Sequence, residues 1–398
     1  MKIGCYHMIS NIMEEQDIDR TLQPFLTSIE DQLGEKLFPL DPADLKKEDV
    51  LPVIFIKSGG VEGKFKRIYQ QFPPPYLLLT SCLYNSLPAA LEIKSYLQKR
   101  GEKVEVLHGS DRWIGQRLKT IKRIIETKKI CRKYRIGVLG EPSEWLIASG
   151  ADYNAVRKRL GMKIYNIPLE EMIRHIDLIK EKDIPIDIIP AGDFDQKTLN
   201  QSLRIYQGLK NLIAEYKFDA ITVRCFEFID FYQNTGCLAL SLLNQEGLIS
   251  GCEGDVPALI SMIILHHLTD EPVFLANPTC INVENNEVTL AHCTIPLNMC
   301  ESYVLKNHFE SGVGTAISGK AQKGPVTIFK LDGNAENYFL AEGEITDNLE
   351  LPNMCRTQLQ VLLKRPVGEF LKESIANHQI ISKGYHSNLV EQFFYYLS

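Results

Sequence analysis

The sequence contains no uninterrupted apolar stretch of the ~18 residues that a membrane-spanning helix needs. Its first ten residues, MKIGCYHMIS, also lack the charged segment followed by an apolar segment that marks a secretory signal peptide. The first absence excludes a membrane-spanning helix, and the second argues against export. We therefore expect the protein to work in the cytoplasm.

Paired cysteines are also missing, although the chain has ten cysteines. No two of them stand in a CxxC arrangement, so the sequence offers neither a zinc knuckle nor a dithiol redox motif. In a reducing compartment, scattered cysteines are usually buried thiols and not disulfides. We expect structural thiols here.

A strongly basic surface is absent as well. The chain has 44 Lys and Arg residues against 50 Asp and Glu residues, mixed along its length, for a net charge of -6. This balance argues against a nucleic-acid partner and against an anionic membrane surface. The most cationic stretch, residues 112–135, has apolar residues at helical spacing, which predicts a helix with one solvated face.

What the sequence does have is the composition of a multidomain enzyme, with 398 residues of which 44% are apolar and 24% charged. Single cores stop growing at roughly 250–300 residues, so more than one domain is expected. In the first third, β-rich runs at 52–57, 76–81 and 103–107 alternate with helical stretches such as 89–99. That alternation predicts a parallel α/β sheet.

A second alternation begins near residue 133, and the pattern changes after residue 253. In the second alternation, the predicted strands and helices lie at 134–139, 162–167, 169–179, 198–215 and 220–225. An apolar helix at 256–268 is then followed by short β-like runs between turns rich in Asn, Gly and Pro, which predicts an antiparallel sheet or barrel. We therefore predict an α/β protein with two tandem doubly wound parallel-sheet domains, residues 1–131 and 132–268, followed by a mainly antiparallel β domain, residues 269–398.

The segment SGCEGDVPALISMIILHHL places two carboxylates, Glu253 and Asp255, on a glycine-rich turn before a strongly apolar helix. Asp255 is well placed as the N-cap, with Pro257 in the first turn, because a side-chain oxygen there satisfies free backbone N–H groups. Glu253 lies at the end of a strand-like run, where α/β sheets usually open their ligand crevice. We predict a catalytic role for Glu253, with Asp255 as the competing carboxylate.

Three further donors follow in strand-like surroundings: Asn277 in FLANPTC, His292 in AHCTIP and His378 in ANHQII. One carboxylate, two imidazoles and an amide oxygen suit Mn²⁺ or a similar divalent ion, with positions left open for a diol. We therefore predict a metal site built from these donors, in which the amide of Asn277 either donates a ligand oxygen or holds a substrate hydroxyl. The competing interpretation is that each histidine is a hydrogen-bonded core residue, since that is the commoner role of a single histidine.

Other candidates for substrate contact are weaker. Trp145 in GEPSEW either stacks on a sugar face or packs between domains. Asn85, with Ser86, either caps the helix that contains Pro88 or touches the hydroxyl tail of a substrate from a neighbouring subunit. Arg356 in MCRTQ and Glu310 in HFESG either contact substrate or form structural salt bridges.

From about Tyr134 to the C-terminus the chain resembles the L-fucose isomerase family and, more loosely, the L-arabinose isomerases. The resemblance rests on GVLGEPSEWLIAS, on KRLGMKIYNIPLEEMIRHI, on the GCEGD turn and on NHQIISKGYH, while NSLPAALEIKSYLQKRG matches the first domain only loosely. It implies that Glu253 and His378 are metal ligands and that Glu253 is also an acid/base. It further implies that His292 matches a histidine at the metal of the arabinose isomerases, and that the protein is a homo-oligomer, a trimer or hexamer.

The resemblance breaks at Asn277, where the fucose isomerases have a second acid/base carboxylate. Isomerisation through an enediol moves a proton between adjacent carbons, and an amide cannot carry it. Either Glu253 serves both carbons, or Asp255 or a water substitutes, or the reaction differs. The leading hypothesis is a metal-dependent sugar isomerase or epimerase; the alternatives are a non-catalytic sugar-binding relative, and a lyase or dehydratase that acts on a sugar acid.

Overall fold

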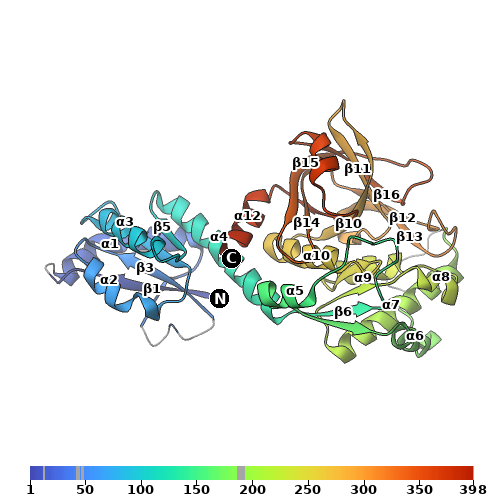
Figure 1. Cartoon of the computed structure of the whole chain (residues 1–398), viewed down its shortest axis with the longest axis horizontal. Coiled ribbons are helices and arrows are strands. Elements are labelled where there is room, and N and C mark those ends of the chain that lie inside the picture. The colour runs from blue at the N-terminus through green and yellow to red at the C-terminus, as the bar shows by residue number, and fades with distance from the viewer. Residues whose placement is uncertain (12–13, 42–44, 46–48, 186–192, 398) are drawn as a thin grey trace. The chain divides into compact units, whose positions relative to one another are not determined.

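The structure is a computed structural model of the chain, and it describes residues 1–11, 14–41, 45, 49–185 and 193–397. The chain divides into two compact units (Figure 1). The first comprises residues 1–126 with 392–396, and the second comprises residues 127–391 with the last residues of the chain. No helix within the described ranges is long and apolar enough to cross a membrane.

The first unit is built on a parallel sheet with the strand order β2-β1-β3-β4-β5. Its strands are β1 (Lys2–Met8), β2 (Phe38–Pro39), β3 (Val50–Ile56), β4 (Tyr76–Thr80) and β5 (Val104–Leu107). Its helices are α1 (Glu15–Leu33), α2 (Glu62–Ile68), α3 (Ser86–Gln98) and the first part of α4 (Asp111–Lys133). Strands β3 and β4 are buried almost throughout, as expected for a parallel sheet that is covered on both faces.

The cationic stretch forms α4, as predicted. Ile114, Leu118, Ile121 and Ile124 are fully buried along one side of the helix, whereas many of its Lys and Arg side chains lie in exposed or half-buried positions. The apolar residues therefore hold the helix against its neighbours, and the charged residues form its solvated face.

The second unit begins with another parallel sheet, of order β7-β6-β8-β9. Its strands are β6 (Arg135–Leu139), β7 (Lys163–Ile167), β8 (Ala220–Val223) and β9 (Ile249–Cys252). The helices are α5 (Tyr153–Leu160), α6 (Leu169–Asp177), α7 (Gln196–Tyr216), α8 (Glu227–Tyr232), α9 (Cys237–Gln245) and α10 (Val256–Thr269). The second α/β alternation predicted from the sequence is thus present.

The rest of the second unit is a closed antiparallel barrel of order β10-β11-β16-β15-β14-β17, joined by an antiparallel ribbon of β12 and β13. The strands are β10 (Val273–Asn282), β11 (Glu287–His292), β12 (Cys300–Lys306), β13 (Ala316–Ala321), β14 (Gly324–Leu331), β15 (Tyr338–Asn348), β16 (Thr357–Leu363) and β17 (Gln379–Lys383). Helices α11 (Phe370–Glu373) and α12 (Ser387–Leu397) complete the chain. β17, which closes the barrel, begins in the ANHQII segment that was described as strand-like.

Helix α10 lies between the parallel sheet and the barrel (Figure 1). It contacts β8 and β9 of the sheet as well as β10, β14 and β17 of the barrel. A helix enclosed in this way must be apolar on every side, and residues 256–265 are all buried or nearly so. Its position explains why the sequence before residue 270 is so hydrophobic.

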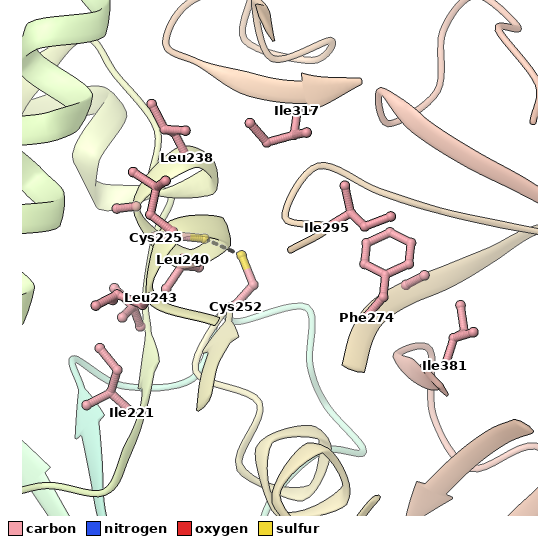
Figure 2. Close-up of a cluster of buried hydrophobic side chains, with 14 of the residues drawn as sticks. Ile221, Cys225, Leu238, Leu240, Leu243, Cys252, Phe274, Ile295, Ile317 and Ile381 are labelled. Atoms are coloured by element: carbon pink, nitrogen blue, oxygen red, sulfur yellow. Dashed lines mark hydrogen bonds between the residues drawn. The ribbon is translucent and has the colours of Figure 1, made fainter. Parts of the chain in front are cut away.

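One hydrophobic cluster runs through both parts of the second unit. Figure 2 shows a portion of it, including Ile221 of β8 and Leu243 of α9 together with Phe274 of β10 and Ile381 of β17. The predicted succession of parallel sheets and an antiparallel β region is therefore present. A boundary at residue 268 stays a prediction, because the core is shared across it.

Candidate active site

The GCEGD turn connects β9 to α10 in an unusual backbone conformation. Glu253 has a φ of +62°, a left-handed value that is rare and costly for a residue with a side chain. Gly254 has a φ of +74°, and a Cβ there would lie 2.7 Å from the Cα of Pro142. The backbone N–H of Ser143 donates to the Glu253 carbonyl at 2.9 Å. The turn is thus pressed against the loop that follows β6, and it aims the Glu253 side chain inward.

The Glu253 carboxylate is 7% exposed and faces three partners. Its Oε2 accepts a hydrogen bond from the indole N–H of Trp145 at 2.6 Å. Its Oε1 lies 3.5 Å from His378 Nε2 and 3.9 Å from His292 Nε2. The structure therefore brings together the three residues predicted as metal ligands.

Strand pairing explains why the two histidines meet. β10 pairs with β11 through Asn277 opposite Ala291, and with β17 through Ala276 opposite Gln379. His292 follows Ala291, and His378 precedes Gln379, so both side chains come to the same end of the barrel on either side of β10. Their rings stand 5.8 Å apart between centroids at 71°.

His378 is held by a buried charged group behind it. Its Nδ1 lies 2.8 Å from Oδ2 of Asp255, and both side chains are fully buried. Because a carboxylate accepts, Nδ1 carries a proton, and Nε2 is the ring nitrogen that points toward Glu253. Within the described residues, Nε2 has no hydrogen-bond partner although it is buried. A buried imidazole nitrogen without a hydrogen-bond partner fits a metal ligand, which binds the ion after losing its proton.

Asp255 has the capping role that the sequence favoured. It accepts from the backbone N–H of Ala258 at 2.8 Å, which confirms the N-cap, and Lys330 Nζ lies 3.0 and 3.1 Å from its two oxygens. Lys330 is also fully buried. With all its partners in place and no surface on the pocket described below, Asp255 is better suited to position His378 than to transfer protons.

The pKa values in this cluster follow from burial and mutual contact. Burial raises the pKa of Glu253, but its contacts with His292 and His378 outweigh burial and lower that pKa overall. Burial lowers the pKa of His378, but the two carboxylates beside it outweigh this effect and raise its pKa. Burial dominates at His292 and lowers its pKa. Glu253 is therefore ionised, which suits both a ligand and a base.

Cys252 also lies near the metal-ligand candidates. One ligand atom each from Cys252, Glu253 and His292 fall within 4.8 Å of one another. The Cys252 thiol, however, lies 2.8 Å from the Cys225 thiol (Figure 2), and this contact together with burial raises the pKa of Cys252 well above its usual value. A thiol that keeps its proton is a poor ligand, so His378 is the better third donor.

A second group with metal-binding spacing, Glu171, His175 and Glu215, lies on α6 and α7. Glu171 already pairs with Arg174 at 2.6 Å and accepts from Tyr216 at 3.0 Å, and Glu215 is exposed. Its carboxylates are therefore occupied by protein partners or by solvent. Both ring nitrogens of His175 have hydrogen-bond partners, so this group has no counterpart of the buried His378 Nε2.

A narrow cavity of about 70 Å³ opens beside Glu253. Its polar lining residues include Glu253, Asn277, His292, His308 and Glu310, and its less polar wall includes Phe226, Ile229 and several cysteines. The outer part is lined by Trp145, Pro278 and Asn377, together with Phe226, Glu253, Asn277 and Glu310. The arrangement can hold a polyol against a carboxylate and two imidazoles.

The predicted substrate contacts fall into different places. Asn277 lines the cavity, and its Oδ1 accepts from Asn377 Nδ2 at 3.2 Å. Trp145 lines the outer part, is 55% exposed and packs edge-to-face on Phe226 with centroids 5.1 Å apart. Its hydrogen bond to Glu253 was not foreseen. Both residues are in position to touch a substrate.

Arg356 and Asn85 lie elsewhere. Arg356 is not among the residues that line the cavity; its Nε donates to the Asn307 carbonyl at 2.7 Å and so fixes the start of the loop between β12 and β13. Asn85 lies in the first unit, at the N-terminus of α3 with a φ of +56°, and makes no side-chain cap hydrogen bond. The capping prediction for Asn85 is wrong, because its side chain makes no cap hydrogen bond and its backbone is left-handed, whereas a capping residue is usually extended. Ser86 is already the first residue of α3, and its hydroxyl accepts from Ser81 N at 3.0 Å.

Sequence reasoning missed His308. It is buried, packs edge-to-face on Phe226 with centroids 5.7 Å apart, and lies 3.2 Å from the Ser311 hydroxyl through Nδ1. Burial, with the charges of His292 and Arg356, lowers the pKa of His308 to about 4, so the ring is neutral near pH 7. The HFESG segment that carries it has no periodicity, and its neighbour Glu310 was the sole signal there.

No family model matches the chain. It is similar to curated proteins named sulfoquinovose isomerase: 26% identical over 313 residues to one from Alkalicoccus urumqiensis, covering 73% of this chain and 68% of the relative. A relative from Priestia megaterium is 23% identical over 348 residues, covering 80% of this chain and 75% of the relative. One from Clostridium sp. is 30% identical over 98 residues, covering 24% of this chain and 22% of the relative. These relatives support a sugar isomerase, and they indicate an enzyme of the aldose–ketose isomerase class, an intramolecular oxidoreductase.

Proposed function

We propose that this protein is a metal-dependent isomerase that interconverts an open-chain aldose and its ketose. The observation that carries the proposal is the buried, unpartnered Nε2 of His378, fixed by Asp255 and 3.5 Å from Glu253 Oε1. Glu253, His292 and His378 would hold the ion, and mixed oxygen and nitrogen donors suit Mn²⁺. When bound, a divalent ion supplies polarisation of the substrate oxygens, which makes the proton on the adjacent carbon more acidic.

The protein's own residues then perform the proton transfer. Glu253 removes the proton from C2 of the open-chain aldose and returns it to C1 of the enediol. Because Oε1 faces the imidazoles, Oε2 is the oxygen that carries this proton, and the Trp145 N–H holds the carboxylate in place. Asn277 binds a substrate hydroxyl, and Trp145 with Phe226 offers the substrate an aromatic wall in the outer part of the cavity.

The lining of the cavity bears on the substrate. Among the described residues that line it are two glutamates, Glu253 and Glu310, and no lysine or arginine. The sulfonated sugar in the relatives' name would therefore need its anionic group bound outside this cavity. We propose an uncharged aldose as the first substrate to test and the sulfonated sugar as the second. By its resemblance to the sugar isomerases, the protein is proposed to act as a cytoplasmic homo-oligomer, a trimer or hexamer.

Incubation of the Mn²⁺-loaded protein with aldoses, sulfoquinovose and sugar acids in D₂O tests the proposal, with products followed by NMR. The expected result is a ketose formed from an aldose without loss of water, abolished by a chelator and restored by Mn²⁺. Loss of water or of a carbon fragment from a sugar acid would favour a lyase or dehydratase. Binding of sugar with no product from any compound would favour a non-catalytic sugar-binding protein.

A further inference from the structure

An aldose–ketose isomerisation moves two protons, one between carbons and one between oxygens. If Glu253 carries the first, as proposed above, another group must deliver a proton to O1 and remove one from O2. Asn277, which lines the cavity beside Glu253, is an amide and cannot do this. Among the described residues that line the cavity, the other carboxylate is Glu310, which lines both its inner and its outer part.

Glu310 sits near the tip of the loop between β12 and β13, and that loop is well fixed. His308 N donates to the Val313 carbonyl at 3.1 Å, and Gly312 N donates to the His308 carbonyl at 2.9 Å. Gly314 has a φ of +70°, and a Cβ there would lie 2.5 Å from Thr235 N. With Arg356 bound to Asn307 at the other end, both ends of the loop are held and its tip is presented to the cavity.

The Glu310 carboxylate has no protein partner to occupy it. Within the described ranges of the chain, it makes neither a hydrogen bond nor an ion pair, and its side chain is exposed at the mouth of the cavity. Arg356, whose side chain reaches the start of this loop, donates to the carbonyl of Asn307.

We propose that Glu310 is a second catalytic residue, which passes a proton between the two oxygens of the substrate while Glu253 passes one between the two carbons. As Glu253 takes the C2 proton, the C2–H electron pair forms the C1=C2 bond, the C1=O pair moves to O1, and Glu310 protonates O1. Glu253 then returns its proton to C1, the C2=O bond forms, and Glu310 takes the proton from O2. Both carboxyl groups end as they began, so no further reactant is needed.

The electrostatics of the cavity agree with this division. Partial burial and the negative charge of Glu253 both raise the pKa of Glu310, whereas Glu253 itself is held ionised by the histidines. Two carboxyl groups whose pKa values are pushed apart suit an acid and a base in one site. The other titratable groups on the cavity are His292, His308, Cys225, Cys237, Cys252, Cys293 and Cys355.

The test compares Glu310→Gln with the wild type on the substrate found above, over a range of pH. Removing the acid should lower kcat by roughly 10²-fold or more while KM changes little, and it should abolish the alkaline limb of the pH profile. Glu310→Asp should keep that limb. Glu301→Gln, an exposed glutamate on β12, is the matched control and should behave as wild type.

Two results would overturn the inference. One is wild-type kcat in Glu310→Gln; the other is a lowered kcat with the alkaline limb unchanged, which indicates a structural role. The inference rests on the proposed function, but different results would contradict the inference and the proposed function. If Glu253→Gln is inactive but Glu310→Gln is fully active, this inference alone fails, whereas a wild-type protein that isomerises no sugar removes both.

Discussion

The imidazole of His378 lies 2.8 Å from the carboxylate of Asp255, and neither side chain is exposed. Asp255 also caps α10 and pairs with the buried Lys330 at 3.0 Å. One carboxylate thus links the start of a core helix, a barrel strand and the orientation of a metal-ligand candidate. The fold and the site are coupled through it.

Asp255→Asn keeps the shape of this residue but removes its charge. Lys330 is then a buried charge without a counter-ion, and we expect a loss of unfolding free energy of roughly 3–5 kcal/mol in urea titrations. Metal affinity should fall about 10–100-fold, since the group that orients His378 is weakened. Asp347→Asn, which breaks an exposed pair with Lys323, is the control and should cost less than about 1 kcal/mol. Equal stability of the two variants would contradict the account.

Trp145→Phe removes the N–H that donates to Glu253 at 2.6 Å but keeps an aromatic ring beside Phe226. A hydrogen bond to a charged group is worth about 1.5–3 kcal/mol, so kcat should fall roughly tenfold or more. Steady-state kinetics separates the possibilities. If KM alone rises, Trp145 acts by binding the sugar and not by orienting Glu253.

Glu253→Gln preserves size and one oxygen donor while removing the base. Turnover should fall by roughly 10²-fold or more, the usual effect of losing a general base. Sugar binding, measured by calorimetry, should survive, and the exposed Glu301→Gln serves again as the control. Wild-type turnover in Glu253→Gln would move the base to another residue.

His7 of β1 predicts an acid sensitivity of the first unit. Burial and the positive charge of Lys57 lower the pKa of His7 from 6.5 to about 4, although Asp19 opposes the shift. Between pH 6.5 and pH 4, His7 is protonated in the unfolded chain but neutral in the folded unit. The contribution of neutral His7 to the unfolding free energy is therefore complete above pH 6.5 and is lost as the pH falls toward 4. His7→Gln should reduce the loss between pH 7 and pH 4 by the order of 2 kcal/mol.

Trp113 reports this unfolding when the other of the chain's two tryptophans is removed by Trp145→Phe. Trp113 belongs to the first unit and Trp145 to the second. Urea titrations at pH 7, 5 and 4, with and without His7→Gln in that background, give the comparison. If the unfolding free energy depends on pH in the same way in both proteins, the titration of His7 is not the cause of the acid sensitivity.

Sequence patterns predicted the features that depend on neighbouring residues, namely the secondary structure and the helix cap. The alternation of short β runs and helices indicated the parallel sheets, and the GCEGD turn followed by Pro257 indicated the N-cap at Asp255. The meeting of Glu253, His292 and His378 was suggested by resemblance and not by pattern. It depends on β10 pairing with both β11 and β17, which are almost a hundred residues apart.

Contacts made by irregular loops were beyond the reach of the sequence. The hydrogen bond from Trp145 to Glu253 and the inward position of His308 depend on loop paths that have no periodicity. At Asn85 the sequence predicted a contact that is absent, because a residue type that often caps helices here adopts a left-handed backbone. Only the tertiary structure fixes such positions.

The most direct measurement is the anomalous scattering of Mn²⁺ in crystals of the active protein. The account predicts a peak within ~2 Å of a carboxylate oxygen of Glu253 and of the imidazole nitrogens of His292 and His378, the range of first-row metal–ligand bonds. A peak at Glu171, His175 and Glu215, with none beside Glu253 in crystals of protein that isomerises sugar, would contradict it.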